Sequence, residues 1–99
     1  MINRYADGND NIGFHKDKDK DLGDEPCIVG VSLGAVRDVS FSADGFIPKK
    51  FPKSFNLQLD NGSIFVMYHP TNTYWKHSIP KRANVNTPRI SLTFRRLYL

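Results

Sequence analysis

Residues 55–67 read FNLQLDNGSIFVM, and this stretch decides the fold that we expect. Apolar and polar residues alternate over 55–59, which is typical of a strand that buries one face. Asp60-Asn61-Gly62 is a turn by composition, because such residues tolerate the backbone angles that tight turns require. The apolar run 63–67 is then a second strand, so the stretch predicts β-structure.

The rest of the chain repeats this succession of short strands and turns. Further strands are expected at residues 1–5, 27–34, 36–41, 74–79 and 89–97. No segment shows helical periodicity, so we predict an all-β fold, either a sandwich or a jelly roll. We count roughly six strands where a jelly roll has about eight, and we therefore expect an N-terminally incomplete domain.

Composition limits the class of protein. The 99 residues, of which 39% are hydrophobic and 12% aromatic, suffice for one small domain with a core. The formal net charge of +4 permits a polyanionic partner such as nucleic acid. A single cysteine, Cys27, excludes an internal disulfide and favours a reducing, intracellular setting. No apolar run could span a bilayer and no signal peptide begins at Met1, so we expect no membrane partner.

Two histidines and a carboxylate are candidate metal ligands. His15 and Asp17 are two residues apart, so on an extended backbone their side chains point the same way. With His77 arriving from a distant strand, they would bind one cation on one side and leave the opposite positions open. That is the arrangement of non-haem Fe(II) oxygenases, whose open positions take a cosubstrate and O₂. The alternative is a polar loop whose charges are solvated.

The last expected strand has one polar and one apolar face. Arg89, Ser91, Thr93 and Arg95 alternate with apolar residues. If the polar face points to solvent, two arginines there need no explanation. If it points into the interior, the arginines need anionic partners, and a dicarboxylate ligand would provide them through paired hydrogen bonds. Residues 3 and 5 alternate in the same way on the first strand and would add hydrogen bonds to that ligand.

Several motifs occur in a fixed order along the chain. They are Asn3-x-Tyr5, Asp7-Gly8-x-x-x-Ile12-Gly13-x-His15-x-Asp17, Ser32-Leu33-Gly34, Gly62-Ser63, His69-Pro70-Thr71-Asn72-Thr73, Trp75-x-His77-Ser78 and Arg89-x-x-x-Thr93-Phe94-Arg95. In type, order and spacing the chain resembles the AlkB family of Fe(II)- and 2-oxoglutarate-dependent dioxygenases, which dealkylate nucleic acids. Among its branches, the chain looks most like the eukaryotic AlkB homologues that repair double-stranded DNA.

This resemblance implies a double-stranded β-helix in which residues 1–99 are the C-terminal portion of the catalytic domain. It also implies a site that uses Fe(II), 2-oxoglutarate as cosubstrate, and O₂. The roles that it implies are Fe(II) ligation by His15, Asp17 and His77; binding of the cosubstrate carboxylates by Arg89 and Arg95, with Asn3, Tyr5 and Ser91 around them; and contact of Asp19 with the amine of the alkylated base. Ser91 departs from the family, which usually has Asn at that position.

The substrate implied by the resemblance is an alkylated base of the 1-methyladenine or 3-methylcytosine type in DNA, flipped out of a duplex. A nuclear location and a monomeric full-length domain are expected with it. Lys81 and Arg82 begin a basic loop after the distal histidine and are predicted to contact DNA phosphates, the alternative being a solvated loop. For the whole chain, the alternative is a catalytically silent, truncated β-domain that at most binds nucleic acid.

Five further positions are assigned other roles. His69 precedes a proline in a turn and is interpreted as a structural loop histidine. Tyr74 and Trp75 flank the distal histidine and are candidates for stacking on a base, although we expect at least one of them in the core. Cys27 is expected to be a small buried side chain. Arg37 is left with two possible partners, Asp38 or a phosphate.

Overall fold

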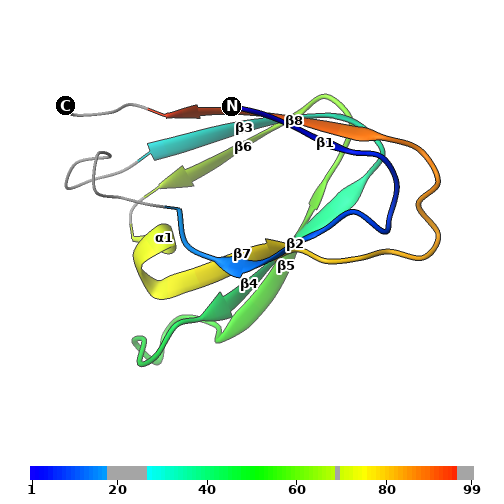
Figure 1. Ribbon diagram of the computed structural model, residues 1–99. Coiled ribbons are helices and arrows are strands. Elements are labelled where there is room, and N and C mark those ends of the chain that lie inside the picture. The colour runs from blue at the N-terminus through cyan, green and yellow to red at the C-terminus, as the bar shows by residue number, and fades with distance from the viewer. Residues whose placement is uncertain (18–26, 69, 96–99) are drawn as a thin grey trace.

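In the computed structural model the described residues are 1–17, 27–68 and 70–95. They form eight strands and one helical turn (Figure 1). The elements are β1 (Ile2–Tyr5), β2 (Ile12–His15), β3 (Cys27–Gly34), β4 (Arg37–Ala43), β5 (Ser54–Leu59), β6 (Ser63–Tyr68), α1 (Thr71–Tyr74), β7 (Trp75–Ile79) and β8 (Arg89–Arg95). Within this part of the chain, no helix is long and apolar enough to cross a membrane.

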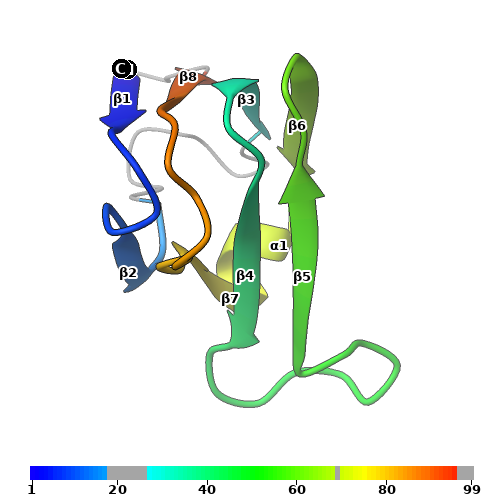
Figure 2. The same ribbon diagram turned by 90° about the vertical axis from the view of Figure 1, so that its right-hand side faces the viewer.

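The strands form two four-stranded antiparallel sheets that face each other (Figures 1 and 2). One sheet has the order β1-β8-β3-β6, and the other has the order β2-β7-β4-β5. The prediction of an all-β jelly roll is confirmed. The count of roughly six strands is too low: the seven expected ranges all contain a strand, and the eighth, at residues 12–15, is too short for alternation to reveal it. One turn of helix, α1, also occupies part of the loop expected before β7.

The turn at residues 60–62 carries the chain from one sheet to the other. β5 pairs with β4, whereas β6 pairs with β3, so the two strands beside the turn do not pair with each other. The turn is anchored to the end of β3, because the Gly62 amide donates to the Ser32 carbonyl (2.7 Å) and the Gly34 amide donates to Asn61 Oδ1 (2.9 Å). Gly34 has φ +92°, and a Cβ there would collide with the Pro88 carbonyl. The crossing from β3 to β4 and the crossing from β5 to β6 therefore lie side by side.

In the β1-β8-β3-β6 sheet, strand β8 has a polar inner face and an apolar outer face. On β8, Ile90 and Phe94 point outward and are 37% and 58% exposed, while Arg89 points inward and is 3% exposed. An apolar row crosses the outer face through paired positions Ile2, Leu92, Val31 and Ile64. The polar face of the last strand therefore points into the interior, as the dicarboxylate hypothesis requires.

The opposite sheet supplies most of the core. Phe41 is 2% exposed and stacks on Phe55 with ring centroids 4.6 Å apart. Trp75 packs edge-on against Phe55 at 5.7 Å, and its indole N–H donates to the Pro52 carbonyl (3.1 Å). Tyr74 packs against Trp75 at 5.9 Å. Both aromatic residues beside the distal histidine thus serve core packing.

Replacing Phe41 by Ala removes a ring that is buried and stacked, so we expect the free energy of unfolding to fall by about 3–5 kcal/mol. Denaturant unfolding followed by circular dichroism measures this loss. Phe46→Ala is the matched control, because Phe46 is 93% exposed and its removal should change stability by less than about 0.5 kcal/mol. Similar losses in the two variants would contradict the assignment of Phe41 to the core.

Candidate active site

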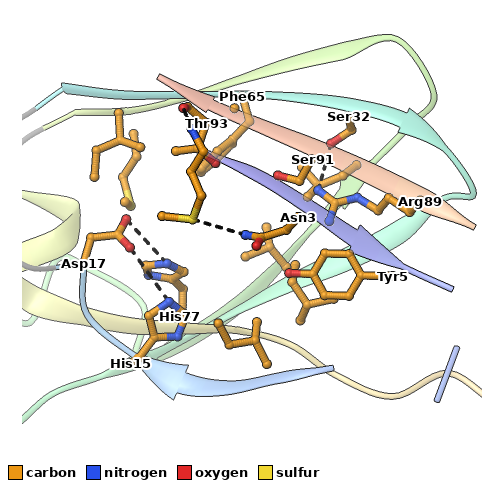
Figure 3. Close-up of a pocket in the computed structure, with 18 of the residues that line it drawn as sticks. Asn3, Tyr5, His15, Asp17, Ser32, Phe65, His77, Arg89, Ser91 and Thr93 are labelled. Atoms are coloured by element: carbon orange, nitrogen blue, oxygen red, sulfur yellow. Dashed lines mark hydrogen bonds and ion pairs between the residues drawn. The ribbon is translucent and has the colours of Figure 1, made fainter. Parts of the chain in front are cut away.

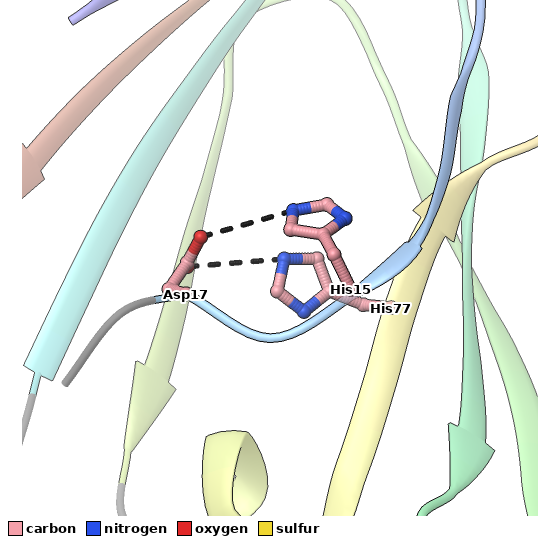
Figure 4. A group of neighbouring side chains, drawn as sticks. All are labelled: His15, Asp17 and His77. Atoms are coloured by element: carbon pink, nitrogen blue, oxygen red, sulfur yellow. Dashed lines mark ion pairs between the residues drawn. The ribbon is translucent and has the colours of Figure 1, made fainter.

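The two histidines of the predicted triad face each other across paired strands. β2 and β7 are antiparallel neighbours, and their register places His15 opposite His77. The ring centroids lie 4.4 Å apart, because directly paired residues point to the same face of a sheet. Asp17 lies two residues beyond the end of β2 and turns its carboxylate toward both rings (Figure 4).

The three side chains fit a divalent metal ion. His15 Nε2 lies 3.8 Å from one Asp17 carboxylate oxygen, and His77 Nε2 lies 3.8 Å from the other. One candidate ligand atom from each residue lies within 4.8 Å of the other two, as for atoms that surround a common centre. His15 Nδ1 lies 2.8 Å from the Gly13 carbonyl, so a proton there leaves the Nε2 lone pair available to the metal. The predicted ligands are therefore brought together.

Burial favours the form of His77 that binds metals. Burial lowers the pKa of His77 below its ordinary value, and electrostatic interaction with His15 and Arg95 lowers this pKa further. The Asp17 carboxylate acts in the opposite direction but does not outweigh burial. A neutral imidazole is the form that coordinates a metal. His77 is thus held ready for coordination at neutral pH.

The backbone of Asp17 is held by a residue that sequence analysis did not assign to the site. Asn72, on α1, accepts a hydrogen bond from the Asp17 amide and donates one to the Asp17 carbonyl, each 3.0 Å long. Lys16 donates to the Thr73 carbonyl (2.8 Å) and pairs with Asp44 (2.7 Å). Helix α1 and Asp44 therefore hold residues 16 and 17 in place.

A cavity of about 390 Å³ lies between the two sheets and reaches the triad (Figure 3). Its polar lining includes the triad and the inner faces of β1 and β8. Its apolar lining comes from β3, β6 and the opposite sheet. The residues around it include Asn3, Tyr5, His15, Asp17, Ile28, Ser32, Leu59, Phe65, Met67, His77, Arg89, Ser91, Thr93 and Arg95. Sequence-predicted metal and cosubstrate residues therefore share one cavity.

Two arginines give this cavity a positive character. The Arg89 guanidinium donates to Ser32 Oγ (2.9 Å) and lies 5.3 Å from the centre of the Tyr5 ring, while its Nε has no partner among the described residues. Burial lowers the pKa of Arg89, although an arginine remains charged at neutral pH. Arg95 lies 3.4 Å from Asp17, and its Nε is also buried without a partner in the described ranges. Guanidinium groups whose buried Nε–H groups lack a partner suit an anionic ligand.

The remaining cosubstrate candidates lie on neighbouring strands. Asn3 and Ser91 are directly paired between β1 and β8, and both line the cavity. The Asn3 amide is 3.5 Å from Met1 Sδ. Asp19, predicted to contact the base, and His69 lie outside the described residues. Cys27 is only partly buried, so the prediction of a buried cysteine is wrong.

Arg37 has partners other than the two predicted, and it holds backbone segments next to the site. It is 1% exposed and donates to three backbone carbonyls: Asp7 (3.1 Å), Asp10 (2.9 Å) and Pro80 (2.7 Å). Neither a phosphate nor Asp38 is therefore its partner in this fold. Arg37 shares the inner face of β4 with two apolar residues, which was the sequence signal that it is buried.

The two basic residues predicted to contact nucleic acid differ in their surroundings. Lys81 is exposed. Arg82 pairs with Asp38 at 3.1 Å, and its amide donates to the Gly8 carbonyl (2.8 Å). Arg82 thus also joins the loop after β7 to the turn between β1 and β2.

Residues 1–95 match the family model of the 2OG-Fe(II) oxygenase superfamily. The chain is 45% identical over 100 residues to the DNA oxidative demethylase ALKBH2 of Bos taurus, a match that covers 98% of this chain and 36% of the relative. It is 44% identical over 102 residues to the ALKBH2 of Homo sapiens, a match that covers 100% of this chain and 39% of the relative. Its identity to the alpha-ketoglutarate-dependent dioxygenase alkB homolog 3 of Mus musculus is 32% over 108 residues, covering 99% and 36%. The chain thus spans between 36% and 39% of the length of these relatives.

We expect His77→Ala to abolish binding of a divalent metal, because it removes one of only two imidazoles in the triad. Titration of the metal-free protein with Co(II), followed by visible absorption, measures this binding. His69→Ala is the control, since His69 is the one histidine that the triad does not use. Equal binding by the His77→Ala variant and the parent protein would remove His77 from the metal site.

Proposed function

The chain belongs to the 2OG-Fe(II) oxygenase superfamily, and on that premise we propose that it forms the metal- and cosubstrate-binding part of an enzyme that oxidatively demethylates alkylated bases in DNA. The observation that carries the proposal is a His-Asp-His triad at a cavity whose opposite wall presents two inward-facing arginines. Similarity to ALKBH2 and alkB homolog 3 supports the AlkB family within the superfamily.

His15, Asp17 and His77 would hold Fe(II). With 2-oxoglutarate and O₂, the bound iron supplies oxidation of an N-alkyl group on the base. The chain prepares the ligands for this role. The Gly13 carbonyl orients the His15 imidazole, and burial keeps His77 neutral.

Arg89 and Arg95 would bind the two carboxylates of 2-oxoglutarate. Both present buried N–H groups that lack a partner among the residues described, and a carboxylate is the acceptor that best matches a guanidinium. Ser91 and Asn3 lie between the two arginines on paired strands and would make further hydrogen bonds to the cosubstrate. Apolar side chains such as Phe65 and Met67 would limit access of water to the cavity.

The names of the relatives and the net charge of +4 support DNA as the nucleic acid that contains the alkylated base. We extend the proposal to double-stranded DNA with 1-methyladenine or 3-methylcytosine lesions, to contact of Asp19 with the flipped base, and to work in the nucleus as a monomer. The alternative of a catalytically silent β-domain is less well supported, because the triad and both arginines are present together in one cavity.

Oxidative demethylation can be tested with an oligonucleotide that carries 1-methyladenine, Fe(II) and 2-oxoglutarate, with succinate and formaldehyde measured as products. We expect Arg95→Ala to lower kcat/KM for 2-oxoglutarate by about 10- to 150-fold, because a hydrogen bond to a charged group contributes about 1.5–3 kcal/mol. Ser91→Ala should have a smaller effect. Arg4→Ala is the matched control, since Arg4 is exposed on the outer side of β1. Equal activity of the Arg95→Ala and parent proteins would contradict this role.

Contact with the DNA backbone predicts that replacing Lys81 and Arg82 together by Ala weakens duplex binding evenly across sequences. The slope of log affinity against log salt should become shallower by an amount equivalent to about two phosphate contacts. The single variants divide this effect: Lys81 is exposed and should account for more of it than Arg82, which pairs with Asp38. Fluorescence anisotropy at several salt concentrations measures the slope.

Turnover of a free methylated nucleoside is the control for this double variant. It should change little, because the triad and the cosubstrate arginines are untouched. An unchanged duplex affinity and salt slope would assign the loop to the solvated surface.

A further inference from the structure

We propose that Asn72 is a positioning residue for the metal site, which fixes the backbone of Asp17 and thereby the direction of the metal-binding carboxylate. This inference rests on the proposed function and assigns a role in it to a residue outside the cavity. Its basis is a pair of hydrogen bonds between the buried Asn72 carboxamide and the backbone of Asp17. Asp17 lies beyond the paired residues of β2, so strand pairing does not hold it.

Asp17 lies where the sheet no longer fixes the chain. β2 ends at His15, and its last paired position is His15 opposite His77. The Asp17 amide and carbonyl therefore lack strand partners, and both bond to Asn72 instead, at 3.0 Å each. An unpaired backbone group in a partly buried position costs free energy, so this pairing holds Asp17 in one place.

Asparagine is suited to this task because a carboxamide carries an acceptor and a donor side by side. It can therefore match the N–H and C=O of one residue, much as a neighbouring strand does. Asn72 is 4% exposed, so water does not compete effectively for these groups. Leucine has a similar branched shape but makes neither bond, and alanine removes both bonds and the shape.

The position of Asn72 also connects two metal ligands. Asn72 is on α1, which is followed at once by β7, the strand that carries His77. Trp75, the first residue of β7, is 5% exposed and fixes this junction in the core. Through Asn72, the Asp17 segment is tied to the segment that carries His77, five residues further on. The relative placement of the two ligands therefore depends on this contact.

Other contacts to the same segment are more exposed. Lys16 reaches the Thr73 carbonyl and Asp44, but the Lys16 and Asp44 side chains are 34% and 38% exposed. Solvent and salt screen an ion pair of that kind, which leaves the buried amide pairing as the stronger constraint. Arg95 approaches the Asp17 carboxylate at 3.4 Å. Without Asn72, Asp17 is free to turn toward this guanidinium and away from the two imidazoles.

The test measures Co(II) binding to the metal-free full protein, with Asn72→Leu as the main variant and Asn72→Ala as the second. We expect both to bind Co(II) at least about 10-fold more weakly than the parent, the range found when groups that orient metal ligands are removed. The visible spectrum of bound Co(II), which reports ligand geometry, should also change. Thermal unfolding without metal shows separately whether each variant is folded.

Asn61→Ala is the matched control. It also removes a hydrogen bond that an asparagine side chain accepts from a backbone amide, that of Gly34, but away from the triad. This control should lower stability without changing Co(II) affinity or spectrum. If Asn72 had only a structural role, its variants would also lose stability without a change in Co(II) affinity or spectrum. The comparison with the control therefore separates a structural role from a role in positioning Asp17.

Co(II) affinity of folded Asn72→Leu or Asn72→Ala within about twofold of the parent, with an unchanged spectrum, would overturn the proposal. Failure of both variants to fold without metal would also overturn it, because the contact would then hold the fold and not the ligand. Failure of the parent protein to bind Co(II) is a different result, which would count against the proposed function itself.

Discussion

The register between β2 and β7 is the constraint on which the site depends. A shift of one residue would turn His15 away from His77, because successive side chains of a strand point to opposite faces. β2 has only four residues and lies at the edge of its sheet, so its own ladder is weak. Buried polar side chains reinforce it at both ends: Arg37 holds the preceding turn, and Asn72 holds the following segment.

The second feature of the fold is a sheet that places the polar side chains of β1 and β8 on its inner face. Its inner face carries Arg89, Ser91 and Arg95, while its outer face carries residues such as Ile64 and Phe94. Buried guanidinium groups lower stability unless an anion compensates them, so this arrangement gives up core packing for a binding site. A dicarboxylate that binds there would stabilise the folded protein as well as take part in its chemistry. The opposite sheet, with its aromatic core, supplies the compensating burial.

Much of the fold and of the site could be predicted from the chain, and the failures have a common cause. The strands with regular alternation and the residues of the triad were predicted from local spacing and motifs, whereas the direction in which the arginines of the last strand point was left open. β2 was missed because four residues carry too little pattern. The partner of Arg37 was missed because it is a set of three carbonyls from two distant loops. Asn72 was missed because its partner lies 55 residues away in the chain.

By itself, the sequence determined the all-β class and the chemistry available to the site. The reason is that alternation, turn composition and the spacing of His15 and Asp17 are local properties of the chain. Only the tertiary structure decided that the turn at 60–62 joins two sheets, that the polar face of β8 points inward, and which backbone groups Arg37 and Asn72 hold. These outcomes depend on which segments meet in space and on where buried polar groups find partners, and no local pattern encodes either.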